Sequence, residues 1–351
     1  MSTTAKAGKT GADGASILRA DLKADAIRRA YIFYGEEAYL RDYYLEQLRK
    51  KLMDGPAEAF NYHRFDERSF SLQALSDAVN ALPIMAERSM VRVDDLDLSG
   101  QNEETREGLA ALLSDLPEYV CLVFYYDVRE YKLDKRQKKL CAAVTDTCTE
   151  LNFPKQSQAS LTEWCIRHFR SAGKRISSDL CAYLIFAVGG TMSALGPEIE
   201  KISAYAAGDE ITKSDIDAVT TPVLEAQVFD ITDAMSVKNF AGALQKLGTI
   251  FQLQQEPIPV LGAVAANLRR LYAAKVLSEA GKGSEALQSL CGIGDYPARK
   301  TMSAARGFSM GWCERAVVLC AETDYQMKTS YDDPKQLLEL LILKLSEEAA
   351  K

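Results

Sequence analysis

Histidine and tryptophan are scarce in this chain of 351 residues, which holds two of each. His63 and His168 have no cysteine or carboxylate nearby at the spacing of metal ligands, so a histidine-based metal centre is not expected. The eight cysteines include no Cys-x-x-Cys pair, and most lie in apolar segments. Reduced, buried thiols are therefore favoured over a zinc site or a disulfide framework.

Long apolar runs and an excess of positive charge are also missing. No stretch approaches the roughly 20 apolar residues of a membrane-spanning helix, and the first residues lack the apolar core of a secretory signal. We therefore expect a cytoplasmic protein that makes no membrane contact. Acidic residues outnumber basic ones, 49 to 42, for a net charge of −7. Because autonomous DNA-binding proteins are usually basic, this balance argues against strong DNA binding by the chain alone, but not against a local basic surface.

Catalytic motifs are absent as well. The sequence contains no G-x-S-x-G, no H-E-x-x-H and no H-x-E followed by C-x-x-C. Asp94 and Asp95 follow a predicted strand, at a place where a nucleotidase could hold Mg²⁺, but an ordinary acidic loop is the favoured interpretation. We expect no catalytic residue, no metal and no cofactor.

What is present is an alternation of strand and helix patterns between Ala30 and about Phe153. The predicted strands are uniformly apolar, which indicates a parallel sheet covered by helices on both faces. After Pro154 the strand patterns stop and helical patterns continue to the end. The expected strands are residues 31–34, 60–65, 90–93, 119–126 and 149–153. A capping box formed by Ser160 and Glu163 is expected to open the first of the later helices.

The first predicted strand ends at Gly35, and a helix is expected from Glu36 to Met53. A strand, a glycine turn and a helix form the frame of a phosphate-binding P-loop, whose motif is G-x-x-x-x-G-K-[ST]. Counted from Gly35, the last three places of that motif hold Leu40, Arg41 and Asp42. Leucine blocks the close approach of backbone to phosphate, and the aspartate repels it. The frame is present, but the residues for nucleotide chemistry are missing.

A predicted amphipathic helix over residues 71–82 carries Leu82 at the end of its apolar stripe, and Pro83 terminates it. Ile84 and Met85 follow, and they cannot both lie on the stripe that Leu82 completes. The pattern alone leaves two interpretations open. The two side chains tuck into the core before the next strand, or they form an exposed apolar wedge for a pocket on a partner.

Basic residues gather in a run over residues 132–139 and in a cluster of Arg269, Arg270 and Lys275. A solvated helix face is the usual meaning of such a run. A surface that faces phosphate is the alternative. Because no aromatic-plus-basic recognition motif accompanies them, contact with the DNA backbone is the most that Arg269, Arg270 and Lys275 can support.

Several segments, taken in their order and spacing, resemble the delta subunit of the bacterial DNA polymerase III clamp loader. The resemblance extends over nearly the whole chain after residue 22. It is carried by residues 31–40, 80–91, 195–202, 228–234, 255–261, 324–328 and 337–342.

The resemblance implies an AAA+-like (RecA-like) parallel α/β domain with a degenerate P-loop, a small helical lid-like domain and a C-terminal helical collar domain. We accordingly divide the chain into a disordered tail, the α/β domain, the small helical domain and the collar or oligomerisation domain. The divisions are residues 1–22, 23–153, 154–221 and 222–351.

In the family, the delta subunit inserts an apolar pair into a pocket of the beta sliding clamp and favours the open ring. Ile84 and Met85 occupy the places of that pair, with methionine where the family more often has an aromatic residue. The resemblance therefore favours the exposed wedge, with Leu82, Pro83 and Arg88 supporting its shape or rim.

The resemblance also implies partners and an absence of activity. The implied partners are the ATPase subunits of the loader (tau/gamma), delta-prime, the beta sliding clamp and primer-template DNA within the complex. Family members do not bind ATP themselves, so we expect a non-catalytic subunit of a DNA-directed DNA polymerase holoenzyme. An arginine finger cannot be assigned. The alternative is an AAA-like adaptor or related loader subunit that binds DNA and partners without opening the clamp.

Overall fold

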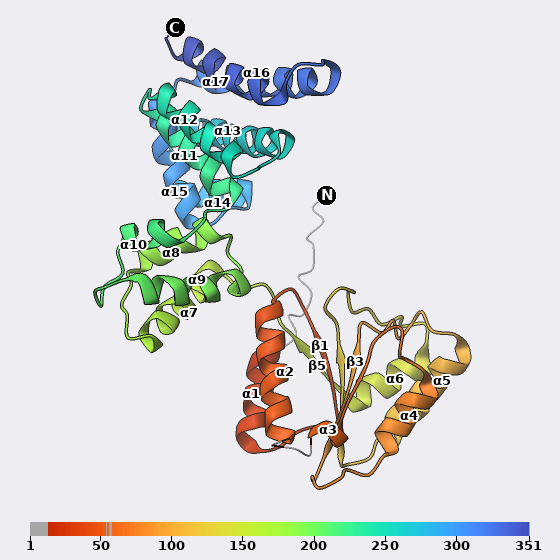
Figure 1. The fold of residues 1–351 in the computed structure, drawn as a ribbon. Coiled ribbons are helices and arrows are strands. Elements are labelled where there is room, and N and C mark those ends of the chain that lie inside the picture. The colour runs from red at the N-terminus through yellow and green to blue at the C-terminus, as the bar shows by residue number, and fades with distance from the viewer. Residues whose placement is uncertain (1–12, 54, 56–57, 351) are drawn as a thin grey trace. The chain divides into compact units, whose positions relative to one another are not determined.

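The computed structural model describes residues 13–53, 55 and 58–350. The chain forms two compact units, which divide between Gln156 and Ser157 (Figure 1). This boundary lies close to the predicted end of the α/β domain at residue 153. The further division of the helical part at residue 221 stays a prediction.

The first unit contains a five-stranded sheet in the order β2-β3-β4-β1-β5, and every neighbouring pair is parallel. The strands lie within one residue of the predicted bounds, except for the start of the second. They are β1 (Ala30–Tyr34), β2 (Tyr62–Phe65), β3 (Ser89–Asp94), β4 (Val120–Tyr125) and β5 (Cys148–Asn152). Central strand β4 is buried along its whole length, as its apolar sequence predicts.

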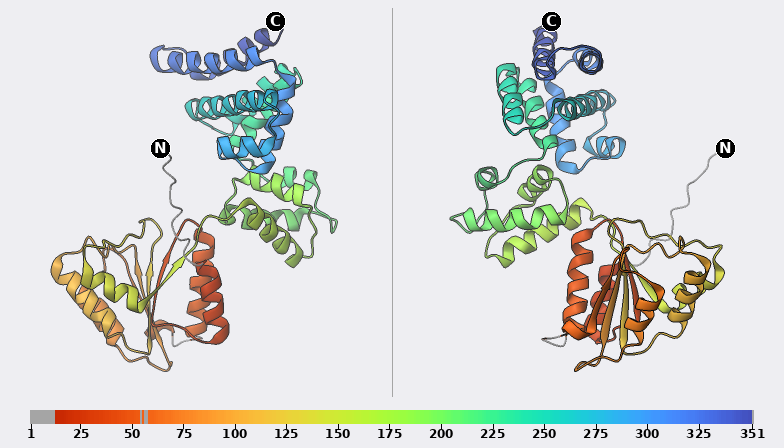
Figure 2. Two further views of the ribbon diagram at one scale, coloured as in Figure 1. Left: turned by 180° about the vertical axis from the view of Figure 1, so that it is seen from behind. Right: turned by 45° about the vertical axis from the view of Figure 1, so that its right-hand side comes forward.

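Helices cover both faces of this sheet (Figure 2). On one face, Tyr31 and Phe33 of β1 pack against α1 (Gly14–Ala24) and α2 (Ala38–Leu52). On the other face, Ile32 packs among residues of three further helices. These are α4 (Leu72–Asn80), α5 (Glu103–Ser114) and α6 (Lys138–Thr147). Because successive strand side chains point to opposite faces, one apolar strand supplies both cores.

The predicted disordered tail is wrong for part of its length. Residues 14–24 form helix α1, while residues 1–12 lie outside the described part of the chain. The carboxylate of Asp13 caps the helix by accepting the N–H of Ala15, and Leu18 is buried. Asp21 accepts hydrogen bonds from Arg28 and from the hydroxyl of Tyr31. The Ala/Gly/Lys-rich composition led to the prediction of disorder, although a short apolar stripe of α1 packs on the sheet.

The second strand also starts later than predicted. Residues 58–61 form α3 (Glu58–Asn61), a single helical turn, and β2 begins at Tyr62 rather than Phe60. The alternating pattern in this stretch is typical of a strand. A local pattern does not predict the hydrogen bonds that the Asn61 side chain makes with a residue far along the chain. This turn contacts the predicted wedge, because Asn61 bonds the backbone of Ile84.

The second unit is helical, as predicted. It comprises α7 (Gln158–Ser171), α8 (Ser178–Val188), α9 (Met192–Tyr205), α10 (Lys213–Val219), α11 (Leu224–Ser236), α12 (Phe240–Gln252), α13 (Pro257–Glu279), α14 (Ser284–Cys291), α15 (Asp295–Ala304), α16 (Met310–Thr329) and α17 (Pro334–Ala350). The predicted capping box at Ser160 is wrong, because Ser157 caps α7 by accepting the N–H of Ser160 at 3.1 Å. Ser177 and Gly189 cap the two ends of α8.

All eight cysteines are free thiols, and six of them are buried, which confirms the favoured interpretation. Burial raises the pKa of Cys121 to about 12, so its thiol stays protonated at neutral pH.

Within the described residues, no group of three or more histidines, cysteines or carboxylates could hold a metal ion. In the same part of the chain, no single helix has the length and apolar character needed to cross a membrane. Helices α8 and α9 reach that standard only as a pair bent by 119°.

Candidate partner-binding segment and a substituted nucleotide site

The segment of residues 81–88, called here the α4–β3 segment, connects α4 to β3. The hydroxyl of Ser71 caps α4 by accepting the N–H of Ala74 at 3.1 Å. The helix ends at Asn80, two residues earlier than predicted, because Pro83 disfavours a helical conformation for the residue before it. Leu82 therefore leaves the apolar stripe and is largely exposed.

Ile84 and Met85 are exposed in this segment. The exposed fractions of the two residues are 52% and 90%. The interpretation that they tuck into the core is therefore wrong. Large apolar side chains held in solvent next to one another are typical of a protein–protein contact. Their assignment as a partner-binding wedge stays a prediction, which this exposure supports.

Hydrogen bonds hold the backbone at both ends of the α4–β3 segment. The Tyr119 hydroxyl donates to the carbonyl of Asn80 at 3.0 Å. At the other end, the guanidinium of Arg88 donates to the carbonyls of Ile27 (2.8 Å) and Glu118 (3.0 Å). The structure thus gives Arg88 the role of anchoring neighbouring backbone, while Pro83 is half-buried. The exposed residues sit on a fixed base.

Between these ends, the side chain of Asn61 forms two hydrogen bonds with the backbone of Ile84. Its amide nitrogen donates to the Ile84 carbonyl and its amide oxygen accepts the Ile84 N–H, each at 2.7 Å. The next residue, Met85, has a φ of 53°, in the left-handed region. Sequence reasoning missed Asn61, because its partner is 23 residues further along the chain.

The glycine turn after β1 packs against the end of β5 and does not form an open phosphate cradle. Gly35 has a φ of 119°, and a Cβ atom placed there would lie 2.3 Å from the carbonyl oxygen of Phe153. The same carbonyl accepts the N–H of Glu37 at 3.0 Å. Backbone donors at the start of a helix are what a P-loop offers to phosphate. Here one of those donors already has a partner within the protein.

A protein cation lies beside this turn. The guanidinium of Arg41 is buried, donates to the carbonyl of Gly35 and forms an ion pair with Asp127. Asp42 accepts a hydrogen bond from the hydroxyl of Tyr125, whose pKa burial raises to about 12. Leu40 packs at the edge of the core on the α1–α2 face of the sheet. All four residues of the predicted degenerate site, Gly35 and Leu40 to Asp42, therefore have structural contacts.

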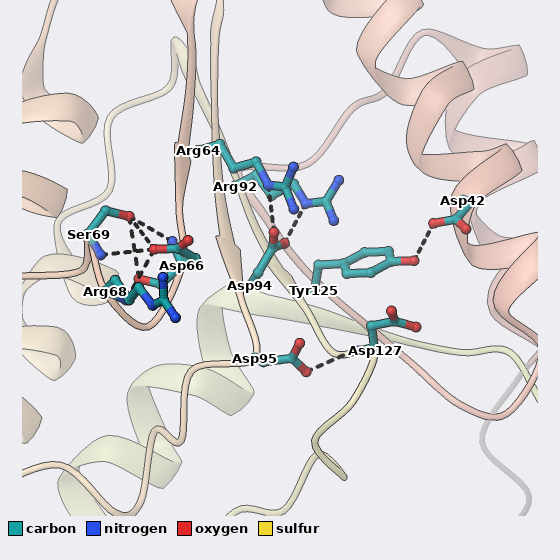
Figure 3. A network of polar contacts seen from close by, with 10 residues as sticks. All are labelled: Asp42, Arg64, Asp66, Arg68, Ser69, Arg92, Asp94, Asp95, Tyr125 and Asp127. Carbon is teal, nitrogen blue, oxygen red and sulfur yellow. Dashed lines mark hydrogen bonds and ion pairs between the residues drawn. The ribbon is translucent and has the colours of Figure 1, made fainter.

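The acidic pair at the end of β3, Asp94 and Asp95, has structural partners too (Figure 3). Asp94 is buried and accepts hydrogen bonds from Arg64, at 2.7 Å, and from Arg92. Asp95 caps the chain after β4 by accepting three backbone N–H groups, from Asp127, Val128 and Arg129, at 2.9 to 3.1 Å. The prediction of an ordinary acidic loop missed this network. The opposed cations Arg64 and Arg92, which pair directly across β2 and β3, are the signal that an acid must lie between them.

Comparisons with known proteins match the N-terminal and C-terminal parts of the chain to the same family. A family model described as "DNA polymerase III, delta subunit" matches residues 31–152, and one described as "DNA polymerase III delta subunit, C-terminal domain" matches residues 225–345. Together they cover more than half of the chain. The chain belongs to the DNA polymerase III delta subunit family.

Relatives of the delta family match along nearly the whole length. The DNA polymerase III subunit delta of Bacillus subtilis is 26% identical over 332 residues, covering 92% of this chain and 94% of the relative. A probable DNA polymerase III subunit delta of Aquifex aeolicus is 23% identical over 331 residues, covering 92% and 93%. The solved structure of the Bacillus subtilis DNA clamp loader delta protein superimposes with a TM-score of 0.57 at 24% identity, covering 95% of this chain and 99% of that one. The predicted fold class is confirmed as a parallel α/β domain followed by helices, the fold of a clamp loader delta protein.

The basic cluster lies on α13 of this delta-family chain. Arg270 forms an ion pair with Glu225 of α11, so part of its charge is neutralised within the protein. Arg269 is exposed and Lys275 is half-buried. In the run after residue 131, Lys132, Arg136 and Lys139 also have carboxylate partners. These pairs fit a solvated face, and contact with DNA stays a prediction for Arg269, Arg270 and Lys275.

Proposed function

We propose that this chain is the clamp-opening subunit of a replicative clamp loader, acting in the cytoplasm as part of a DNA polymerase III holoenzyme. It binds the beta sliding clamp by inserting Ile84 and Met85 into an apolar pocket, and this binding favours the open ring. The observation that carries the proposal is the exposure of these two adjacent apolar side chains on a segment whose backbone is fixed from three sides.

The mechanism follows from linkage between binding and conformation. A partner shifts the balance between open and closed rings only by the difference in its affinity for the two states. Burying an isoleucine or methionine side chain contributes roughly 1.5–3 kcal/mol. Two anchors that fit better in the open ring therefore allow a bias of about 100-fold, at about 1.4 kcal/mol for each factor of ten.

Nucleotide chemistry is assigned to other subunits in this proposal. The tau/gamma ATPase subunits and delta-prime complete the loader, and primer-template DNA enters the assembled complex. The surface of Arg269, Arg270 and Lys275 contributes at most contacts to the DNA backbone. The ion pair between buried Arg41 and Asp127 and the bonded N–H of Glu37 support the absence of ATP binding, because both remove features that a phosphate would need.

Mixing the intact chain with purified beta sliding clamp tests the proposal. We expect a stable complex by calorimetry or gel filtration, without nucleotide. We also expect separation of a fluorophore pair placed across one subunit boundary of the ring. Binding with no change in the fluorophore pair would indicate the adaptor class instead of an opener. No binding of the clamp would reject the proposed function.

Titration with ATP and Mg²⁺ should give no saturable heat from the intact chain. The physical reason is that the chain after Gly35 lacks the second glycine, the lysine and the hydroxyl residue of the P-loop motif. In addition, Arg41 already donates a hydrogen bond to the carbonyl of Gly35. A motor subunit of a clamp loader, titrated in the same buffer, provides the positive control. Saturable binding at micromolar ATP, or steady phosphate release by the chain alone, would contradict the assignment.

A further inference from the structure

Helix α3 lies at the same edge of the sheet as the α4–β3 segment. It leads directly into β2, and the α4–β3 segment leads directly into β3. These two strands are parallel neighbours, with Tyr62 paired to Met90, so the chain segments that enter them meet at one edge. The contact between Asn61 and Ile84 occurs at this edge.

Asn61 is a polar residue in an almost sealed environment, with an exposed fraction of 1%. Buried amides are retained where their hydrogen bonds are made, because an unsatisfied buried amide is costly. Both polar atoms of this amide bond the backbone of Ile84, one as donor and one as acceptor. The side chain therefore bonds Ile84 as a neighbouring strand would, and it fixes both the N–H and the carbonyl of this residue.

Met85 needs such a restraint. A left-handed φ is disfavoured for any residue that carries a Cβ atom, and methionine has no side-chain group that compensates. Without the bonds from Asn61, the backbone beside Ile84 would populate other conformations, and fewer molecules would hold the conformation that binds. When a binding conformation is populated by only a fraction of molecules, the apparent dissociation constant rises by the inverse of that fraction.

Phe60 precedes Asn61 on the same helical turn, and its exposed fraction is 60%. Neighbouring Cα atoms are 3.8 Å apart, so Phe60 lies within about 10 Å of the Ile84 backbone through the Asn61 side chain. An aromatic side chain spans much of this distance. Phe60 is therefore an exposed aromatic residue close to the exposed residues Leu82, Ile84 and Met85. Aromatic residues are enriched among the side chains that dominate binding energy at interfaces.

We propose that α3 is the second half of the clamp-binding element. Asn61 is a positioning residue that holds Ile84 and Met85 in the binding conformation, and Phe60 is a third apolar contact with the clamp. This inference rests on the proposed function and names parts of the chain that the resemblance does not assign. The occupant is the same sliding clamp, because Asn61, the residue next to Phe60, bonds the backbone of the proposed wedge.

The test measures the affinity of intact variants for purified beta sliding clamp, at a temperature well below their thermal midpoints. Phe60→Ala should weaken binding about tenfold, because it removes one large apolar contact. Tyr43→Ala is the matched control, since Tyr43 is an exposed aromatic residue on α2 and should leave affinity unchanged. Equal affinity of Phe60→Ala and the unsubstituted chain would overturn the contact assigned to Phe60.

Asn61→Ala should weaken binding about tenfold or more, if at most a tenth of the molecules retain the binding conformation. Asn61→Gln keeps both the donor and the acceptor on a side chain one methylene longer, so its loss should be smaller, and it serves if the alanine variant does not fold. The positioning role predicts coupling, so Asn61→Ala should cost less affinity in a Met85→Ala background. It also predicts faster hydrogen exchange at the amide of Ile84. An equal loss in both backgrounds would indicate general destabilisation and overturn the positioning role.

The outcome separates this inference from the proposed function. If Ile84→Ala with Met85→Ala still binds the clamp at full affinity, the proposed function itself fails. If that pair loses binding while the Phe60 and Asn61 variants bind normally, the wedge stands and only the role of α3 is rejected.

Discussion

Replacing Ile84 and Met85 together by alanine should weaken binding of the beta sliding clamp by at least about 100-fold. Each side chain is expected to contribute roughly 1.5–3 kcal/mol when it enters an apolar pocket, and about 1.4 kcal/mol corresponds to a factor of ten in affinity. The fold should remain intact, because both residues are exposed and the bonds from Asn61 go to backbone atoms that alanine also has. Calorimetric titration of the clamp, with circular dichroism of the free variant, measures both expectations.

Val128→Ala is the matched control for this variant. Val128 is also an apolar residue in the α/β unit with an exposed fraction of 90%, and it lies after β4. Loss of a solvent-exposed apolar side chain at that place should leave clamp affinity unchanged. Retention of full clamp affinity by the Ile84→Ala, Met85→Ala double variant would remove the basis of the proposed function, whatever the control shows.

The second large effect is expected at Gly35, on stability. A Gly35→Ala substitution should lower the free energy of unfolding of the α/β unit by about 3 kcal/mol or more. Two costs combine here. A φ of 119° is strained for alanine, and the new Cβ would meet the Phe153 carbonyl oxygen at 2.3 Å. Because the carbonyl is backbone at the end of the sheet, relief requires β5 to move away from β1.

Urea unfolding can assign this loss to the correct unit. Both tryptophans, Trp164 and Trp312, lie in the helical unit, so their fluorescence reports on that unit while far-ultraviolet circular dichroism reports on both. We expect the dichroism transition to move to lower urea with little change in tryptophan fluorescence. Gly173→Ala provides the comparison, because Gly173 also has a positive φ but no atom within 4 Å of the added Cβ. It should cost only about 1 kcal/mol. Equal effects of the two substitutions would show that the clash with Phe153 is not the cause.

Local patterns were sufficient for most elements of this fold. The strand β4 needed only its continuous apolar run to be located. Helix α1 was missed because the composition around it is typical of a disordered tail. Its stability comes from packing of Leu18 on the sheet, which no window of sequence contains.

Part of the candidate site could likewise be predicted from the sequence, and part could not. The position of Ile84 and Met85 beyond a helix end was visible in the sequence, because Pro83 stops the helix that would have buried them. The residues that fix the segment were not visible. Asn61 and Arg88 act through backbone groups that are 23 to 61 residues away along the chain, and polar side chains carry no periodicity that predicts such partners. The resemblance supplied the choice between core and wedge, and exposure in the structure supports it.

The buried guanidinium beside the glycine turn has a consequence for motion. In a motor subunit, the negative charge that neutralises the P-loop lysine arrives and departs with each triphosphate, and each change drives a new shape. Here Arg41 stands at the place of that lysine, and the charge that neutralises it is the carboxylate of Asp127, which is covalently part of the chain. Under the proposed function, the α/β unit has no nucleotide-driven change of its own, and its movements during a loading cycle follow those of the ATPase subunits.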